Sequence, residues 1–311
     1  MKTAAIDLGS NTVKMTIAER ANDGTLSILK ECADFTRIGE RLDQTGRLQP
    51  EAIERTLKVV AAYVQTAESF GVARMACVGT AGLRGAENAD VFLQRAQEEA
   101  GIDIEVIEGL REAALAYRAP AAAYGPGPMV VVDIGGRSTE IIAGDGPSID
   151  GQVSLEMGSV RLTERYLPSD PPRSDELEAL DHGIQTHLAN APSAASNAVL
   201  VGVSGTILSL MGVHLGLDDM SKVARDGEGG WLLKASVEEA FAFFAARPAD
   251  QRRRGTVIPQ GRADVIVAGT ALVRSLMTHY GVDQLRVTRL GVRYGLLAEL
   301  FDRDDRRSTI E

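Results

Sequence analysis

Three glycine-containing turns in the sequence carry groups suited to binding phosphate, at residues 9–12, 135–139 and 202–206. Consecutive backbone N–H groups in such a turn point at one anion, and glycine is needed where a Cβ would block its approach. One such turn alone is more often only a turn, but three together favour a phosphate site. The candidate ligands are Gly9, Ser10, Asn11, Thr12, Gly135, Gly136, Arg137, Ser138, Thr139, Ser204, Gly205 and Thr206.

Carboxylates accompany the first two turns. Asp7 and Asp133 each end an apolar run, where a carboxylate that merely packed into the core would be costly. Carboxylates beside phosphates usually hold Mg²⁺, so both are candidate metal ligands, and Glu140 is expected to join the metal or orient water. The alternative is that these acids cap their loops. Glu112 is a further candidate, although Glu108 lies on the same helical face and an exposed acidic stripe is the alternative there.

Basic side chains near the turns would bind phosphate oxygens, guanidinium groups as forks and lysine as a point charge. Each of them alone is more often a surface residue than a ligand, and the run of arginines at 252–254 could supply part of a positive pocket, although such a run is usually a solvated face. The four histidines have no metal-binding spacing and are expected to be structural, and Cys32 and Cys77 are expected to be reduced core residues. The candidate basic residues are Lys14, Arg84, Arg137, Arg161 and Arg262.

Composition limits the class of protein. The chain has 311 residues, 44% of them hydrophobic and 24% charged, which is enough for one or two buried cores. Its formal net charge of -10 argues against a nucleic-acid-binding face, so a polyanionic substrate needs a local positive pocket. The sequence shows neither a secretory signal nor a long apolar segment, so a soluble cytoplasmic protein without a membrane partner is expected.

A repeated pattern predicts the architecture. Residues 4–18 and 130–144 each read as a β-hairpin, and aligning Asp7 with Asp133 also aligns Gly9 with Gly135. Gene duplication of one α/β domain is the simplest explanation, and two such domains facing each other would bring both turns to one cleft. The Gly/Pro cluster at 125–128 predicts a boundary between domains 1–124 and 125–311.

The remaining elements support the α/β class. Apolar periodicity in the first half predicts helices at 51–70, 87–100 and 108–124, a strand that ends in a polar loop at 74–84, and a strand at 102–107. In the second half it predicts helices at 176–189 and 262–281, with strand, turn and helix at 198–212 and again at 285–301.

The ordered motifs IDLGSNTVKM, EGLREAALAY, VVDIGGRSTEII, RADVIVAGTALV and LGVRYGLLAEL resemble those of the exopolyphosphatase and guanosine pentaphosphate phosphohydrolase family, over essentially the whole chain. The resemblance, to the short two-domain members, implies two actin-like, ribonuclease H-like domains of the sugar kinase and heat-shock ATPase superfamily with an interdomain cleft. It implies a Mg²⁺-dependent removal of terminal orthophosphate from inorganic polyphosphate, guanosine pentaphosphate or both. Family members often dimerise, so a homodimer is one expectation.

The same resemblance implies roles for single residues. Glu112 would be the general base for the attacking water, Asp133 and Glu140 would hold Mg²⁺ and assist the water, and Arg84 would contact phosphate. Two positions depart from the family pattern, because Arg137 and Ser204 each stand where a glycine is usual. An actin-like ATPase or sugar kinase is one alternative function. A polyphosphate-binding or nucleotide-binding regulator that has lost hydrolysis is another.

Overall fold

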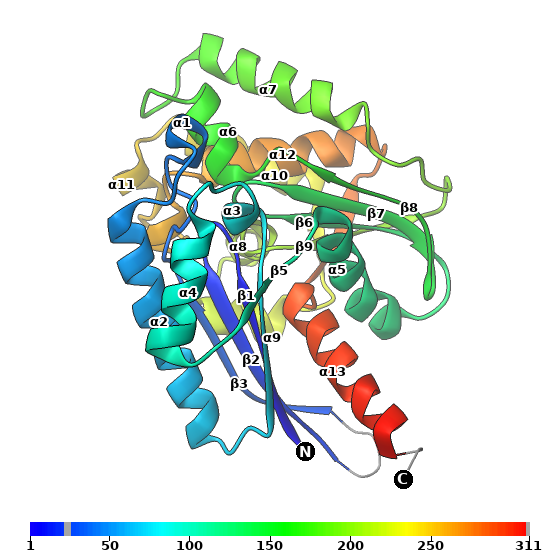
Figure 1. Cartoon of the computed structure of the whole chain (residues 1–311). Coiled ribbons are helices and arrows are strands. Elements are labelled where there is room, and N and C mark those ends of the chain that lie inside the picture. Colours follow the sequence, from blue (N-terminus) through cyan, green and yellow to red (C-terminus); the bar gives the residue numbers. More distant parts are fainter. Residues whose placement is uncertain (22–25, 309–311) are drawn as a thin grey trace. The chain divides into compact units, whose positions relative to one another are not determined.

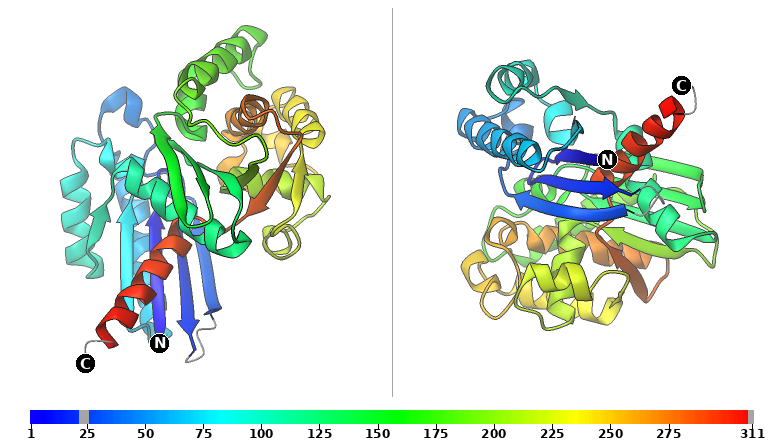
Figure 2. Two further views of the ribbon diagram at one scale, coloured as in Figure 1. Left: turned by 90° about the vertical axis from the view of Figure 1, so that its right-hand side faces the viewer. Right: turned by 90° about the horizontal axis from the view of Figure 1, so that it is seen from below.

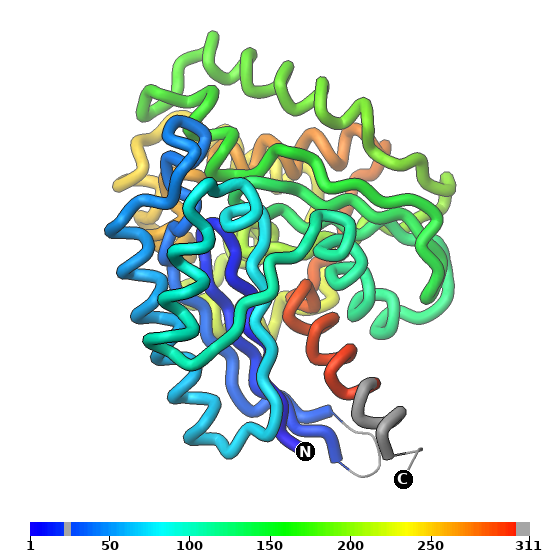
Figure 3. The backbone as a smooth tube through the Cα atoms, viewed as in Figure 1, coloured from blue at the N-terminus to red at the C-terminus, as the bar shows by residue number. Residues whose placement is uncertain are grey.

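The computed structural model describes residues 1–21 and 26–308, with side chains as far as residue 302. The chain forms two compact units. The first unit is Met1–Ala119 together with the chain from Val292 onward, and the second unit is Pro120–Gly291. The backbone therefore passes from one unit to the other twice (Figure 3). The first passage lies inside helix α5 (Gly109–Tyr124), at Pro120, where a proline removes one helical hydrogen bond.

The first unit is built on a five-stranded sheet in the order β3-β2-β1-β4-β5. Its strands are β1 (Lys2–Leu8), β2 (Val13–Arg20), β3 (Leu26–Asp34), β4 (Arg74–Gly79) and β5 (Ile104–Val106). β1, β2 and β3 form an antiparallel meander, while β4 runs parallel to β1 and β5 parallel to β4. This order places the carboxyl ends of β1, β4 and β5 along one edge of the sheet.

Helices cover both faces of this sheet (Figures 1 and 2). On one face, α2 (Pro50–Ser69) and α4 (Ala89–Ala100) pack against Ile6, Leu8, Met15 and their neighbours. On the other, α5 and α13 (Val292–Ser308) pack against Ala5, Ala18 and Val78. The two short helices α1 (Leu42–Thr45) and α3 (Ala81–Arg84) lie in the connections.

The second unit repeats the same sheet and adds one edge strand. Its order is β10-β11-β9-β6-β7-β8. The strands are β6 (Pro128–Ile134), β7 (Thr139–Asp145), β8 (Ser148–Leu155), β9 (Val199–Val203), β10 (Trp231–Leu233) and β11 (Gln284–Thr288). Strands β6, β7, β8, β9 and β11 correspond in order and direction to β1 through β5. The duplication inferred from the two hairpins therefore extends to a whole five-stranded sheet.

One helix forms the centre of the second unit's core. Helix α12 (Ile266–His279) is apolar around most of its circumference, as expected for a helix surrounded by others. It packs against α6 (Ser159–Tyr166), α7 (Ser174–Leu188), α8 (Gly205–His214) and α10 (Lys234–Ala245). The shorter helices are α9 (Met220–Asp226), α11 (Ala249–Arg252) and the 3₁₀ turn Gln260–Arg262.

The α/β class and the predicted long helices are confirmed, but several details differ. Residues 81–84, expected as loop, form α3, and the helix expected from residue 262 begins at Ile266. Cys77 is buried, whereas Cys32 is only half-buried, and both are free thiols. In the part of the chain that the structure describes, no helix combines the length and apolar character needed to cross a membrane.

The final helix is the main difference from the expected division at residue 124. α13 was expected in the second domain but packs within the first unit. A Cβ at Gly295 would lie 2.1 Å from the carbonyl oxygen of Leu115, so α13 and α5 touch backbone to backbone. Leu296 and Leu297 are buried in the same core as Ala5 and Ala18. Burial of its apolar side chains against the first sheet therefore places α13 in the first unit.

Candidate active site

The first loop joins β1 to β2 and is held closed by its own backbone. The Gly9 N–H donates to the Thr12 carbonyl at 3.2 Å, and a Cβ at Gly9 would lie 3.0 Å from that same oxygen. Ser10, Asn11 and Thr12 are all buried. A tight turn with glycine at its start and three polar residues behind it is the geometry expected of a phosphate loop.

The second loop, between β6 and β7, repeats this geometry. The Gly135 N–H donates to the Ser138 carbonyl at 2.9 Å, and a Cβ at Gly135 would again lie 3.0 Å from the acceptor oxygen. The alignment of Gly9 with Gly135 therefore holds at the level of individual hydrogen bonds, with Thr12 and Ser138 as the equivalent acceptors.

Helix α6 holds the second loop from behind. The N–H groups of Ser159 and Val160 donate to the carbonyls of Gly135 and Gly136 at 3.0 and 2.8 Å. A Cβ at Gly158 would lie 2.5 Å from the Arg137 nitrogen, so only glycine fits between helix and loop. The N-terminus of α6 therefore satisfies the carbonyls of the second loop, a contribution that local sequence patterns do not predict.

Arg137, which replaces the usual glycine of the second loop, has a side chain that is only 1% exposed. Its Nη1 lies 3.9 Å from Oε2 of Glu164, on α6. Its pKa is lowered to about 10, mainly by burial and also by the charge of Arg161, while Glu164 and Glu156 oppose the shift. Within the second unit, the side chain therefore runs along α6 and leaves the loop's tight turn intact.

Asp133 and Glu140 are directly opposite residues of the antiparallel pair β6 and β7. Opposite side chains share one face of the sheet, with Cβ atoms about 5 Å apart. Glu140 is buried and accepts a hydrogen bond from Ser154 Oγ at 2.7 Å, and a Cβ at Gly291 would lie 3.4 Å from Asp133 Oδ2. Two adjacent hard oxygen ligands fit Mg²⁺, which is usually bound by one or two carboxylates, waters and substrate phosphates.

Asp7 differs from these two acids. Its opposite residue on β2 is Lys14, whose Nζ lies 3.9 Å from Oδ2 of Asp7. Burial raises the pKa of Asp7, and the charges of Lys14 and Arg293 oppose that shift. Among the described residues, no group of three or more His, Cys, Asp or Glu side chains is placed to hold a metal. Of the three predicted acidic ligands, Asp133 and Glu140 therefore lie side by side in the second unit, while Asp7 forms an ion pair in the first.

Glu112 and Arg84 are brought together in the first unit. Arg84 Nη1 donates to the Ile107 carbonyl at 2.7 Å and lies 3.3 Å from Oε2 of Glu112. Glu112 is 6% exposed and sits in the first turn of α5, where the helix dipole favours a carboxylate. Glu108, by contrast, is exposed. Glu112 is therefore a buried, paired carboxylate and not part of an exposed acidic stripe.

The short helix α3 links this pair to the first loop. A Cβ at Gly82 would lie 3.1 Å from the Ser10 Cα, so α3 packs directly on the loop two residues before Arg84. The first loop, Arg84 and Glu112 thus lie at one edge of the first sheet, at the carboxyl ends of β1, β4 and β5.

The third loop joins β9 to α8, beside the second loop, because β9 and β6 are parallel neighbours. Ser204, where the family has glycine, caps the helix, since its Oγ accepts from the Ile207 N–H at 3.0 Å. Arg262 Nη1 lies 3.4 Å from Thr206 Oγ1, and a Cβ at Gly205 would lie 2.0 Å from its Nη2. Burial lowers the pKa of Arg262 to about 10, with the charge of Asp264 opposing.

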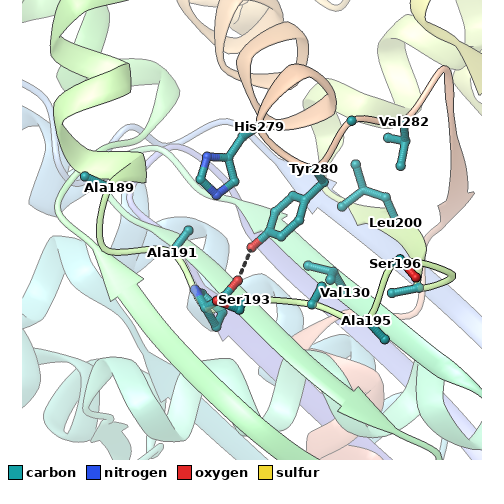
Figure 4. Close-up of a pocket in the computed structure, with 14 residues that line it drawn as sticks. Val130, Ala189, Ala191, Ser193, Ala195, Ser196, Leu200, His279, Tyr280 and Val282 are labelled. Carbon is teal, nitrogen blue, oxygen red and sulfur yellow. Dashed lines mark hydrogen bonds between the residues drawn. The ribbon is translucent and has the colours of Figure 1, made fainter.

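Two other groups of residues stand apart from these loops. Arg252 is buried and donates to Asp170 Oδ1 at 2.6 Å, while Arg253 and Arg254 are exposed, which favours the surface alternative for this run. A pocket of about 470 Å³ lies near the opposite, amino-terminal ends of β6 and β9 (Figure 4). There the Tyr280 hydroxyl donates to the Pro192 carbonyl at 3.0 Å. Of the described residues that line this pocket, none is a predicted site residue.

Comparison with known proteins identifies the family. The model of the "Ppx/GppA phosphatase family" matches residues 16–304. The chain is 31% identical to "Exopolyphosphatase 2" of Mycobacterium tuberculosis, over 96% of this chain and 98% of that protein. It is 32% identical to "Guanosine-5'-triphosphate,3'-diphosphate pyrophosphatase" of Vibrio vulnificus, over 99% of this chain but only 61% of that longer protein.

Solved structures support the same family assignment. A crystal structure of the Aquifex aeolicus member of the Ppx/GppA family superposes with a TM-score of 0.81 at 32% identity, covering 97% of this chain and 98% of that one. A crystal structure of an exopolyphosphatase-like protein gives a TM-score of 0.89 at 25% identity, covering 96% and 97%. The expected fold, two actin-like α/β domains, is thereby confirmed. The chain is a phosphoanhydride hydrolase by enzyme class, and it belongs to the Ppx/GppA phosphatase family.

Proposed function

We propose that this protein is an exopolyphosphatase that removes terminal orthophosphate from inorganic polyphosphate, guanosine pentaphosphate or both, by attack of water on the terminal phosphorus. The observation that carries the proposal is the buried pair of Glu112 and Arg84 beside the first loop. A phosphate loop alone only binds. A carboxylate held next to such a loop is the group needed to accept a proton from water.

Glu112 acts as the general base. Its guanidinium partner Arg84 keeps the carboxylate in the ionised form that accepts a proton, and the same guanidinium supplies donors to a phosphate oxygen. Arg84 is itself fixed by the Ile107 carbonyl, so it does not need to be ordered when substrate arrives. Positioning of this kind supplies much of the acceleration in phosphoryl transfer, because its transition state is loose.

The loops bind the phosphates. The loop carbonyls accept hydrogen bonds from Arg37 and Gly39 in the first loop and from α6 in the second, which fixes both loops. Backbone N–H groups in loops fixed in this way would donate to the phosphate oxygens. Arg262 adds a buried guanidinium at the third loop, and burial lowers its pKa to about 10. A phosphate bound there would accept charge-assisted hydrogen bonds from this guanidinium and favour its charged form.

Asp133 and Glu140 are the residues that would hold Mg²⁺. The ion, when bound, would neutralise phosphate charge and stabilise charge that develops on the transferring group. Ser154 orients Glu140 by its hydrogen bond, and Gly291 leaves space beside the Asp133 carboxylate. The protein thus presents two carboxylates on one face of the sheet and restricts the motion of their side chains.

Phosphate release from the purified protein tests the proposal. Polyphosphate, guanosine pentaphosphate and ATP are supplied in parallel, each with Mg²⁺ and with EDTA. The proposal expects Mg²⁺-dependent release from one or both of the first two substrates. Turnover of ATP alone would favour the actin-like ATPase or sugar kinase alternative, and tight binding of polyphosphate without release would favour a regulator that has lost hydrolysis.

A further inference from the structure

The segment between β3 and α1 is part of the first loop's surroundings, although the sequence motifs do not point to it. The N–H groups of Arg37 and Gly39 donate to the carbonyls of Asn11 and Ser10, at 3.1 and 2.9 Å. Ile38, between them, is fully buried and anchors the segment. Arg37 is therefore fixed by its backbone directly beside the first loop.

Arg37 has an unusual backbone conformation. Its φ is +54°, in the left-handed region that is comfortable for glycine and costly for other residues. Of the residues that the structure describes, Arg37 and Arg41 are the only non-glycine residues with positive φ. Strained positions of this kind cluster at functional sites, where the side chain is needed. An arginine held in this conformation against a phosphate loop suggests that its guanidinium is used.

The charges around the first loop lead to the same conclusion. Lys14 lies 3.9 Å from Asp7, and Arg84 lies 3.3 Å from Glu112, so each predicted cation is matched by a carboxylate. A substrate with a negative charge on every phosphate favours further cations beside these two pairs. Arg37 stands on the segment that is hydrogen-bonded to the same loop, and the residue is only half-buried.

We propose that Arg37 is a substrate-binding residue, whose guanidinium contacts the phosphate chain at the first loop. The inference rests on the proposed function, because it takes the first loop as a phosphate site. The ligand class it assigns is a linear chain of phosphates, and its contribution is a charge-assisted hydrogen bond to a phosphate oxygen.

Arg37→Gly tests this, with Arg41→Gly as the matched control. Both positions have the same left-handed backbone, with φ of 54° and 56°, so glycine relieves the same strain at each. Arg41 is exposed. Binding of polyphosphate of defined length is measured by calorimetry in EDTA, together with KM in Mg²⁺ and with Tm. Arg37→Gly is expected to raise Kd and KM about tenfold with no loss of Tm, whereas Arg41→Gly leaves Kd and KM unchanged and likewise loses no Tm.

A second variant separates charge from flexibility. Arg37→Asn keeps a side chain that tolerates the left-handed conformation but has no charge, so it is expected to lose binding as Arg37→Gly does. Wild-type affinity in either Arg37 variant, or an equal loss in Arg41→Gly, would overturn the inference. A wild-type protein that binds polyphosphate but releases no phosphate would instead refute the proposed function and leave the binding comparison valid.

Discussion

Asp133 and Glu140 stand directly opposite each other on β6 and β7, so the second hairpin presents two carboxylates on one face. The equivalent pair in the first hairpin is Asp7 and Lys14, an acid and a base. The duplicated hairpins have therefore diverged in charge at one position. The second hairpin thus carries the acidic pair that we propose as the Mg²⁺ ligands, and the first carries an ion pair.

Glu140→Gln should weaken metal binding, since it removes one of two charged oxygen ligands without changing shape. We expect the affinity for Mn²⁺, measured by electron paramagnetic resonance as a probe for Mg²⁺, to fall at least about tenfold. Asp145→Asn is the control, because Asp145 ends the same strand and is exposed. Unchanged Mn²⁺ affinity in Glu140→Gln would remove Glu140 from the metal site.

Glu112→Gln should lower kcat by about 10²- to 10⁴-fold, as expected for the loss of a general base, while polyphosphate Kd changes little. Glu108→Gln, one turn earlier on the chain and exposed, should behave as wild type. Single-turnover phosphate release and calorimetric binding measure the two quantities. Near-normal kcat in Glu112→Gln would show that another group accepts the proton.

Gly158→Ala should destabilise the protein and displace the second loop. Its Cβ would lie 2.5 Å from backbone atoms of Gly136 and Arg137, which have no flexible side chain to move aside. We expect the free energy of unfolding to fall by about 1–3 kcal/mol, measured by urea denaturation. At Gly85 an added Cβ meets its nearest atom at 3.4 Å, so Gly85→Ala should stay within about 0.5 kcal/mol of wild type. Equal stability of the two variants would mean that α6 and the loop are less tightly packed.

Arg262 should reduce stability at neutral pH in the absence of substrate. Burial disfavours the charged form and lowers its pKa to about 10 in the folded protein, below the ordinary value of an arginine in the unfolded chain. Between these values the unfolded chain binds more protons, so this residue's contribution to stability rises with pH across that window. At pH 8 the Arg262 guanidinium is charged in both the folded and the unfolded state. Only the folded state removes this charge from water, so the charge lowers the free energy of unfolding.

The variant Arg262→Met should accordingly be more stable than wild type at pH 8, by about 1 kcal/mol or more, with the difference shrinking towards pH 11. It should also lose the rise in Tm that polyphosphate gives the wild type. Arg253→Met, at an exposed arginine, should show neither effect. A less stable Arg262→Met at pH 8 would mean that the protein itself compensates this charge.

Local patterns were enough to predict the repeated hairpins and the long helices. An apolar run, an Asp-Gly turn and a second apolar run specify a hairpin by themselves, and their recurrence at Asp7 and Asp133 indicates duplication. Helices α2, α4 and α5 followed from apolar periodicity. The candidate ligands lie at strand ends for the same reason, since each loop follows its strand directly in the sequence.

Contacts between distant segments were not predictable from such patterns. Nothing in the sequence indicates that α13 returns to the first sheet, because that depends on close packing at Gly295. The direct contact of Arg84 with Glu112 depends on the parallel order of β4 and β5. Gly158 is required by close packing against the second loop, and Arg37 is placed by a backbone hydrogen bond to the first loop. Neither contact leaves a trace in hydrophobic periodicity.

Hydrolysis of polyphosphate in ¹⁸O-labelled water tests the central claim most directly. If water attacks the terminal phosphorus, each released orthophosphate carries one ¹⁸O from the solvent and the shortened chain carries none, as mass spectrometry would show. Label in the shortened chain, or unlabelled phosphate transferred to a hydroxyl acceptor, would contradict the proposed hydrolysis at the terminal phosphate.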